Sequence, residues 1–346
     1  KRWREIPTGI KKTGGYFIME GFLSVKEATK SYAQGCKAKA ATPIGKLFGK
    51  AMLAGMMIGM GAAASSVAAH SVANVGLARL TAAVVFPVGL MMVILLGAEL
   101  FTGDCLMALG VAEKHISVAD CIRVLVLVFL GNFAGALIFT ALVYCSGQLD
   151  YSAGGLGAYT IKVAYGKATL PFGKAFTSGI LCNILVCAAV LMAICAKDIS
   201  GKLLVSFFVI MLFVTAGFEH CVANMYYITA GLFCKMNSDY VNKAMELYGY
   251  TEAQLSQLSW GSFLIKNLIP VTLGNIVGGI CCIGLPPTIF KPRKKIKQVI
   301  LRVTLNFRVT LFLKIRIYCI WCSCAIFWRI ARSRFCVRGV CSKIKL

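Results

Sequence analysis

Charged side chains are scarce in this sequence of 346 residues. They make up 14% of the chain and hydrophobic residues 58%, whereas soluble domains are about a quarter charged and about half apolar. The mean hydropathy is +0.77. So little polar surface excludes a water-soluble pair of domains, and long apolar runs predict an all-α integral membrane protein.

Acidic residues are missing from the C-terminal stretch. From residue 291 onward there are 15 Lys or Arg and no Asp or Glu, and this end carries most of the net charge of +24. The preceding 290 residues hold 22 basic and 13 acidic residues. Because the excess within the body is modest, the sequence predicts no nucleic-acid partner.

Metal-binding patterns are also lacking. No CxxC motif is followed by a matching second pair or a histidine pair, and many of the 16 cysteines lie in apolar runs, where a free thiol behaves as a small hydrophobe. Cys319, Cys322 and Cys324 lie close together without further ligands and give only a weak metal signal. We expect no metal and no cofactor. The N-terminus lacks the apolar core of a cleavable signal peptide.

The two ends differ from the body of the chain. Residues 1–18 precede Met19 and are interpreted as a translated leader or added residues, and residues 19–47 as a cytoplasmic N-terminal segment. Residues 291–346 form a basic tail, interpreted as translation of a non-native frame or as a membrane-surface tail. The membrane domain is expected at residues 48–290.

Six apolar segments are long enough to cross the ~30 Å of a bilayer core. They lie at residues 48–70, 81–109, 118–145, 172–196, 202–231 and 260–285. Residues 1–50 hold 11 Lys or Arg, whereas segments 71–79, 146–170 and 232–260 hold five altogether. The positive-inside rule therefore predicts that both termini are cytoplasmic.

The two halves of the domain resemble each other. The pattern FGKA with a glycine four residues later occurs at 48–55 and 172–179, and LGN followed by glycine occurs at 130–135 and 273–278. GAE at 97–99 corresponds to GFE at 217–219. Each half has three spans, so the second half enters the membrane from the opposite side, as in an inverted 3+3 repeat.

Spans two and five carry charge where apolar residues are expected. Glu99 and Asp104 flank a short apolar stretch, and Glu219 with His220 follows Gly217. A carboxylate at membrane depth costs ~2.5 kcal/mol or more on insertion scales, so it should face protein or a water-filled cavity. We interpret Gly97, Glu99, Gly217 and Glu219 as structural helix breaks along a pathway, with buried structural hydrogen bonding as the alternative for either glutamate.

Four segments closely resemble signatures of the formate/nitrite transporter family, which includes formate, nitrite and hydrosulfide channels. They are residues 97–103 (GAELFTG), 179–187 (GILCNILVC), 217–225 (GFEHCVANM) and 267–275 (NLIPVTLGN). The resemblance covers about residues 22–285. It implies a homopentamer of aquaporin-like protomers in a bacterial cytoplasmic membrane, with helices two and five interrupted and no enzymatic activity.

The resemblance also implies roles for single residues. His220 matches the family's central histidine, Thr102 the threonine of the interrupted second helix, and Asn183 a pore asparagine expected to orient the histidine. Lys167 matches a vestibule lysine. Three further residues match the hydrophobic constrictions: Leu100, Phe101 and Phe213. Tyr226 and Tyr227 depart from the family pattern, where less polar residues are expected.

Elementary physics suggests how such a pathway could pass an anion. Desolvating an ion in an apolar constriction costs far more than one hydrogen bond returns. Lys167 would attract a monovalent anion, whose pKa rises as it loses water, so that it takes up a proton. His220 is the candidate proton donor or hydrogen-bond partner, since the unperturbed pKa of imidazole is ~6.5.

Two other classes of protein stay open at this stage. A neutral-solute channel of the aquaporin type shares interrupted helices and inverted repeats, although the paired Asn-Pro-Ala motifs are missing. A membrane-bound redox subunit is suggested by the many cysteines, but a haem or metal site in a helical bundle needs several facing ligands. Among anions, formate, nitrite and hydrosulfide are all conjugate bases of weak acids.

Overall fold

The computed structural model describes residues 11–13, 16–18 and 22–286. The chain divides into two compact units, Lys1–Arg293 and Lys294–Leu346, and all described residues lie in the first. The basic tail at 291–346 therefore falls outside the described residues. Near the N-terminus, β1 (Lys11–Thr13) and β2 (Tyr16–Ile18) pair antiparallel, and α1 (Val25–Ala40) follows.

Six helical segments are long and apolar enough to cross a membrane. They are α2 (Ile44–Ala69), α3 (Val75–Val85) with α4 (Val88–Leu96), α7 (Val118–Cys145), α9 (Phe172–Cys195), α10 (Ile199–Ala216), and the last helix, made of π-helical η3 (Ser262–Leu268), α14 (Ile269–Ile276) and π-helical η4 (Val277–Gly284). The predicted all-helical membrane fold with six spans is confirmed.

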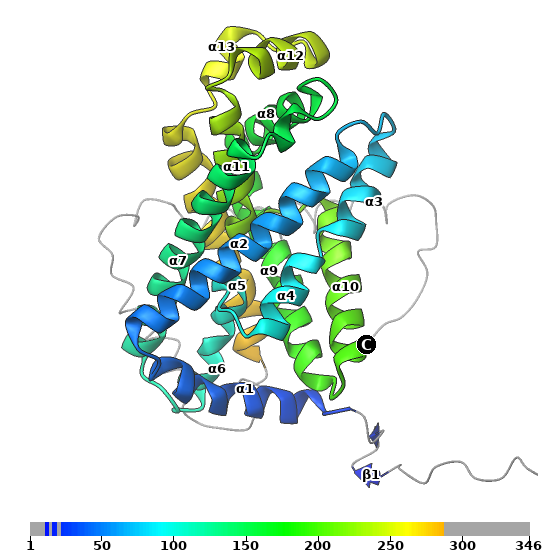
Figure 1. The fold of residues 1–346 in the computed structure, drawn as a ribbon. Helices are drawn as coiled ribbons and strands as arrows, with labels where there is room; N and C mark the ends of the chain where they lie inside the picture. Colours follow the sequence, from blue (N-terminus) through cyan, green and yellow to red (C-terminus); the bar gives the residue numbers. More distant parts are fainter. Residues whose placement is uncertain (1–10, 14–15, 19–21, 287–346) are drawn as a thin grey trace, which may run out of the picture. The chain divides into compact units, whose positions relative to one another are not determined.

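Spans two and five are each broken in two (Figure 1). The second span continues as α5 (Phe101–Asp104), a short 3-10 helix η1 (Cys105–Met107) and α6 (Ala108–Ala112), and the fifth as α11 (Cys221–Cys234). The predicted segments 81–109 and 202–231 each ran through a break. The second span also begins earlier than predicted, at Val75, because the side chain of Asn74 accepts a hydrogen bond from the N–H of Leu77 and caps the helix.

The connections between spans hold helices that the sequence analysis did not predict. Residues 146–170 contain the 3-10 turn η2 (Gln148–Asp150) and α8 (Gly155–Ala168), and residues 232–260 contain α12 (Ser238–Tyr248) and α13 (Glu252–Ser256). Helix α1 lies across the opposite end, against α6 and α9 (Figure 1).

Glycines let the helices of each half approach closely. A Cβ built at Gly135 of α7 would lie 1.9 Å from the carbonyl oxygen of Met52 in α2. A Cβ at Gly278 would lie 2.3 Å from the carbonyl oxygen of Ile180 in α9. Both glycines belong to the repeated LGN segments, so the same close packing of small residues holds the first and third spans of each half together.

Candidate functional site

Each interrupted helix ends at a glycine in the left-handed conformation. Gly97 follows α4 with φ of 65°, and Gly217 follows α10 with φ of 74°. An L side chain is disfavoured there, which is why glycine is the usual residue just past a helix end. The predicted interruption of helices two and five is confirmed, and in the structure the two helices end at these glycines.

Two asparagines satisfy the backbone groups that the breaks leave free. Asn132 of α7 accepts a hydrogen bond from the N–H of Phe101 (2.9 Å) and donates to the carbonyl oxygens of Ala51 (2.7 Å) and Glu99 (2.9 Å). Its side chain is fully buried. Because unpaired backbone groups at membrane depth are costly, this one side chain stabilises the whole break.

Asn275 of α14 does the same for the other half. It accepts from the N–H of Cys221 (2.9 Å) and donates to the carbonyl oxygens of Gly179 (2.8 Å) and Glu219 (3.0 Å). In the sequence, Asn132 and Asn275 mark the internal repeat, and this second role was not predicted. The signal was present, since a polar residue recurred at the same place in the third span of each half.

His220 lies at the second break, with both ring nitrogens hydrogen-bonded. Its Nδ1 accepts the backbone N–H of Ala223 (3.0 Å), which makes the imidazole the N-cap of α11. Its Nε2 lies 2.8 Å from Oγ1 of Thr102 in the other half. Because Nδ1 is an acceptor, the proton of the neutral ring is on Nε2, directed at the Thr102 hydroxyl. The structure thus brings together the predicted histidine and threonine.

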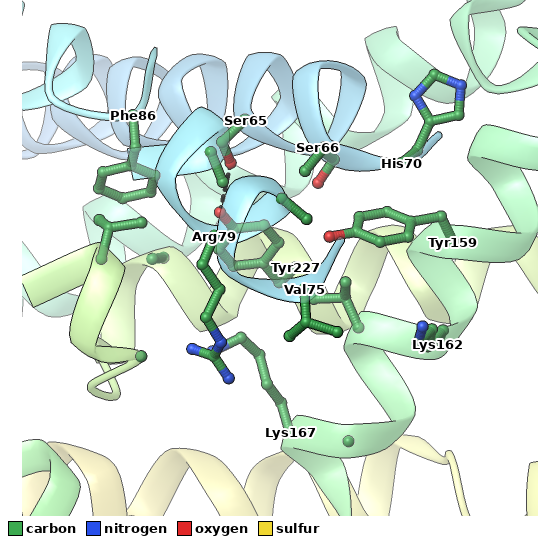
Figure 2. Close-up of a pocket in the computed structure, with 18 of the residues that line it drawn as sticks. Ser65, Ser66, His70, Val75, Arg79, Phe86, Tyr159, Lys162, Lys167 and Tyr227 are labelled. Carbon is green, nitrogen blue, oxygen red and sulfur yellow. Dashed lines mark hydrogen bonds between the residues drawn. The ribbon is translucent and has the colours of Figure 1, made fainter. Parts of the chain in front are cut away.

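A cavity of about 1030 Å³ leads from α8 and α12 to His220. Phe213 lines it, and its ring lies 6.0 Å from the imidazole and 5.6 Å from the ring of Phe86, edge to face. Figure 2 shows Phe86 among the residues that line this cavity. Phe86 was missed in the sequence, because it lies just before a proline in a continuous apolar run and carries no distinguishing pattern.

Lys167 lines the same cavity but forms an ion pair. Its Nζ lies 2.8 Å from Oε1 of Glu219, and both side chains are largely buried. The other oxygen of Glu219 accepts from the side chain of Asn224 (2.6 Å). Asn267 donates to the carbonyl oxygen of Lys167 (2.9 Å). Lys167 therefore lines the cavity with its charge already matched by a carboxylate, and its role as a vestibule lysine stays a prediction.

One of the two tyrosines that depart from the family pattern also lines this cavity. The hydroxyl of Tyr227 lies 2.7 Å from Oγ of Ser65, and its ring centroid lies 5.3 Å from Nζ of Lys167. Tyr226 is buried and packs its ring against Phe139 at 5.6 Å. Of the two tyrosines that depart from the family pattern, only Tyr227 therefore lines the cavity.

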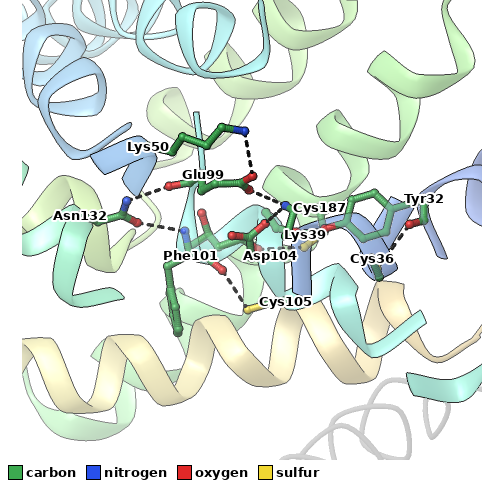
Figure 3. A network of polar contacts seen from close by, with 12 residues as sticks. Tyr32, Cys36, Lys39, Lys50, Glu99, Phe101, Asp104, Cys105, Asn132 and Cys187 are labelled. Carbon is green, nitrogen blue, oxygen red and sulfur yellow. Dashed lines mark hydrogen bonds and ion pairs between the residues drawn. The ribbon is translucent and has the colours of Figure 1, made fainter. Parts of the chain in front are cut away.

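The break in the first half has its own ionic cluster (Figure 3). Lys39 of α1 lies 2.5 Å from Oε2 of Glu99 and also pairs with Asp104, and Lys50 lies 3.7 Å from Oε1 of Glu99. The hydroxyl of Tyr32 donates to the carbonyl oxygen of Gly103 (3.2 Å). Each buried glutamate of the repeat thus has a lysine partner, as buried charges require.

Asn183 lies on α9, the fourth span, as expected, but its side chain has a different partner from the one expected. Its side-chain nitrogen donates to the carbonyl oxygen of Asn275 (2.7 Å), and it is fully buried. Within the described residues it makes no hydrogen bond to His220, so the idea that it orients the imidazole was wrong. The N–H of Ala223 and the hydroxyl of Thr102 orient the ring instead.

Leu100 and Phe101 are buried beside the first break and do not line the large cavity. The ring of Phe101 packs edge to face on Phe129, with centroids 5.1 Å apart. Their role as a second constriction stays a prediction. Among residues 22–286 no group of three His, Cys, Asp or Glu side chains is placed to hold a metal ion. Cys319, Cys322 and Cys324 lie outside the described residues.

Comparison with known proteins gives consistent results. The formate/nitrite transporter family model matches residues 26–289. The chain is 40% identical over 210 residues to the formate channel FocA of Haemophilus influenzae, covering 61% of this chain and 73% of that protein. It is 37% identical over 277 residues to a probable formate transporter of Methanothermobacter thermautotrophicus, covering 75% and 93%.

A solved structure supports the same assignment. A pentameric formate channel with formate bound matches with a TM-score of 0.65 at 32% sequence identity, covering 70% of this chain and 95% of that one. The family match spans most of the chain and includes both helix breaks and the residues around them. This multi-pass membrane protein therefore belongs to the formate/nitrite transporter family of channels and transporters and is not an enzyme.

Proposed function

We propose that this protein passes small monovalent anions of weak acids, such as formate, nitrite or hydrosulfide, across a bacterial cytoplasmic membrane as a homopentamer with both termini in the cytoplasm. The observation that carries the proposal is the Thr102–His220 hydrogen bond of 2.8 Å, which lies next to the Phe213 ring at the end of a cavity rich in basic residues. The similar pentameric formate channel supports the oligomeric state.

The cavity supplies the first step, which is to attract an anion. Its lining includes five Lys or Arg side chains and a single acidic one, Glu219. When a cleft with low-dielectric walls is lined by charges of one sign, the local concentration of ions of the opposite sign rises. A neutral-solute channel has no use for this charge, so the cavity favours an anion over the aquaporin-type alternative.

The phenylalanines supply the second step, which is to remove water. As the anion approaches Phe86 and Phe213 it loses hydration, and the pKa of its conjugate acid rises because the charged form is disfavoured. A formate-sized anion then takes a proton from the water of the cavity. The neutral acid can enter the apolar neck, whereas a chloride ion, the base of a strong acid, stays charged and is held back.

His220 supplies hydrogen bonding within the neck. With Nδ1 occupied by the N–H of Ala223, a second proton on this ring would break the N-cap bond. We therefore propose that the imidazole stays neutral, donates from Nε2 to the passing acid, and is not the source of its proton. The hydroxyl of Thr102 can donate or accept a hydrogen bond, so it can bind both the protonated and the deprotonated form of the substrate.

The test is flux into proteoliposomes that contain the purified protein. Formate uptake is expected to saturate and to rise as the external pH falls, and nitrite and hydrosulfide should compete with it. Glycerol swelling should equal that of empty vesicles. Rapid glycerol flux without formate uptake would replace this function with the neutral-solute alternative, and formate current independent of pH would contradict neutralisation in the cavity.

A further inference from the structure

Most basic side chains of the cavity already have a partner. Lys167 is paired with Glu219 at 2.8 Å, and Lys243 with Glu246 at 3.0 Å. The ammonium of Lys162 lies 4.3 Å from the ring centroid of Tyr248. These contacts reduce the charge that each lysine can offer to an incoming anion, because a carboxylate or an aromatic face already occupies part of its coordination.

Arg79 of α3 differs from these lysines. It lines the cavity, and among the described residues no carboxylate forms an ion pair with its guanidinium. Figure 2 shows its side chain extending into the cavity in which Lys167 also lies. A guanidinium without a carboxylate partner is free to bind an anion from solution.

The guanidinium of Arg79 lies beside the second helix break. A Cβ built at Gly217 would lie 2.3 Å from Nη1 of Arg79, so the guanidinium rests on the glycine of the second helix break. His220 lies three residues further along and lines the same cavity. The charge of Arg79 also reaches Tyr159, whose pKa is raised by burial of the phenol while Arg79 acts to lower it.

The shape of guanidinium decides which anion it holds best. Its planar fork makes two parallel N–H···O bonds to an anion that presents two oxygens on one atom, whereas the ammonium of lysine acts as a point charge. Formate and nitrite present such a pair of oxygens. Hydrosulfide has one sulfur atom and cannot accept a bidentate pair.

We propose that Arg79 is the receiving site of the cavity for planar two-oxygen anions and biases the channel towards formate and nitrite over hydrosulfide. This inference rests on the proposed function and goes beyond it, because it assigns the discrimination between substrates to a residue at the helix break. Arg79 binds the anion before desolvation, and Lys167 remains the partner of Glu219.

The experiment compares the wild-type protein with Arg79→Lys and Arg79→Gln in proteoliposomes. Uptake of labelled formate gives the half-saturating formate concentration, and unlabelled nitrite and hydrosulfide give half-inhibitory concentrations. Arg79→Lys keeps the positive charge and removes the planar guanidinium that makes two parallel hydrogen bonds. The half-saturating formate concentration and the half-inhibitory nitrite concentration should therefore rise roughly 3- to 10-fold more than the half-inhibitory hydrosulfide concentration. Lys174→Gln, at another basic residue of the lining, should change all three values by one common factor.

Nitrate provides a second measurement on the same vesicles. It is planar but is the base of a strong acid, so it should occupy Arg79 without being carried, and inhibit formate uptake in wild type more strongly than chloride does. This preference for nitrate over chloride should disappear in Arg79→Gln. The inference would be overturned if Arg79→Lys changed the half-saturating and half-inhibitory concentrations of all three anions by the same factor, or if Arg79→Gln kept the preference for nitrate over chloride. Formate uptake by the wild-type protein would be unaffected by either result.

A purely structural role for Arg79 is tested in parallel. A guanidinium near the C-terminus of α10 could act only on the helix dipole. In that case Arg79→Gln would lower the thermal unfolding temperature in detergent. It would leave the ratio of the half-saturating formate concentration to the half-inhibitory hydrosulfide concentration at the wild-type level, which overturns the inference. Absence of formate uptake by the wild-type protein would instead overturn the proposed function itself.

Discussion

Leu100 and His220 have the same backbone conformation at equivalent positions of the two interrupted helices. Their φ and ψ angles are −114° and 121° for Leu100 and −114° and 117° for His220. The first half places an apolar side chain there and the second half an imidazole. A symmetric backbone thus carries an asymmetric set of side chains, and Thr102 from the first half completes the polar pair.

Replacing His220 by phenylalanine should separate hydrogen bonding from proton supply. The change leaves the buried Thr102 hydroxyl without its partner, which costs ~1–3 kcal/mol, and formate flux should fall by about tenfold or more. The residual flux should still decrease as the pH rises, since the proton comes from water in the cavity. Flux of His220→Phe measured across a pH series checks both statements.

The matched control is His70, whose Nε2 lies 2.8 Å from Oγ of Ser152 at the far end of the same cavity. His70→Phe should leave formate flux within about twofold of wild type, as most substitutions away from the chemistry do. A pH profile that becomes flat in His220→Phe, and not in His70→Phe, would show that the imidazole does relay the proton.

The buried asparagines at the helix breaks should be needed for stability. Asn132→Leu keeps a similar volume and removes three hydrogen bonds at the break after Leu96, so it should lower the free energy of unfolding by ~2–4 kcal/mol. Thr140→Val, which removes one hydroxyl from another buried site of α7, should cost only ~1 kcal/mol. Unfolding in detergent measures both, and an Asn132→Leu protein as stable as Thr140→Val would contradict this role.

The breaks themselves could be predicted from the sequence, while the contacts across them could not. Glycine followed by a buried glutamate is a local signal, and its recurrence at Gly97 and Gly217 identified the interrupted helices. The partners of Glu219 come from three other elements, since Lys167, Asn224 and Asn267 lie on α8, α11 and η3. Periodicity and hydropathy report on one helix at a time and carry no information about which elements meet.

The same limit explains the errors about single residues. Asn183 lies in a segment that resembles a family motif, but its side chain donates to the carbonyl oxygen of Asn275 on a neighbouring helix rather than to the histidine. Phe86 was overlooked because an apolar residue in a span is the ordinary case, and only its edge-to-face contact with Phe213 distinguishes it.

Removing Lys167 should do more than delete one positive charge. Lys167→Ala leaves the Glu219 carboxylate in the cavity without its ion-pair partner, where it repels an incoming anion, so the half-saturating formate concentration should rise by about tenfold or more. The double variant Lys167→Ala with Glu219→Gln should recover part of this loss. Formate uptake at varied concentration measures both proteins, and a double variant worse than Lys167→Ala would exclude charge repulsion as the cause.

Lys39 should hold α1 against the first break. Lys39→Met leaves two buried carboxylates, Glu99 and Asp104, without their main partner, and breaking such a pair costs ~3–5 kcal/mol. Lys30→Met, at an exposed position of the same helix, is the matched control and should be within ~0.5 kcal/mol of wild type. Limited proteolysis should cut the N-terminal segment faster in Lys39→Met alone, and equal cleavage of both variants would contradict the assignment.

The left-handed glycines at the two helix breaks offer a comparison within one molecule. Gly97→Ala and Gly217→Ala both place a Cβ at positive φ, which costs ~1–2 kcal/mol at each site. At Gly97 the added atom meets nothing within 4 Å, whereas at Gly217 it would lie 2.3 Å from Nη1 of Arg79 and must displace the guanidinium. Both variants should therefore lose similar stability, but only Gly217→Ala should raise the half-saturating concentration of formate relative to the half-inhibitory concentration of hydrosulfide. If Gly97→Ala shifts this ratio equally, the effect comes from the strained breaks and not from the guanidinium that lies on one of them.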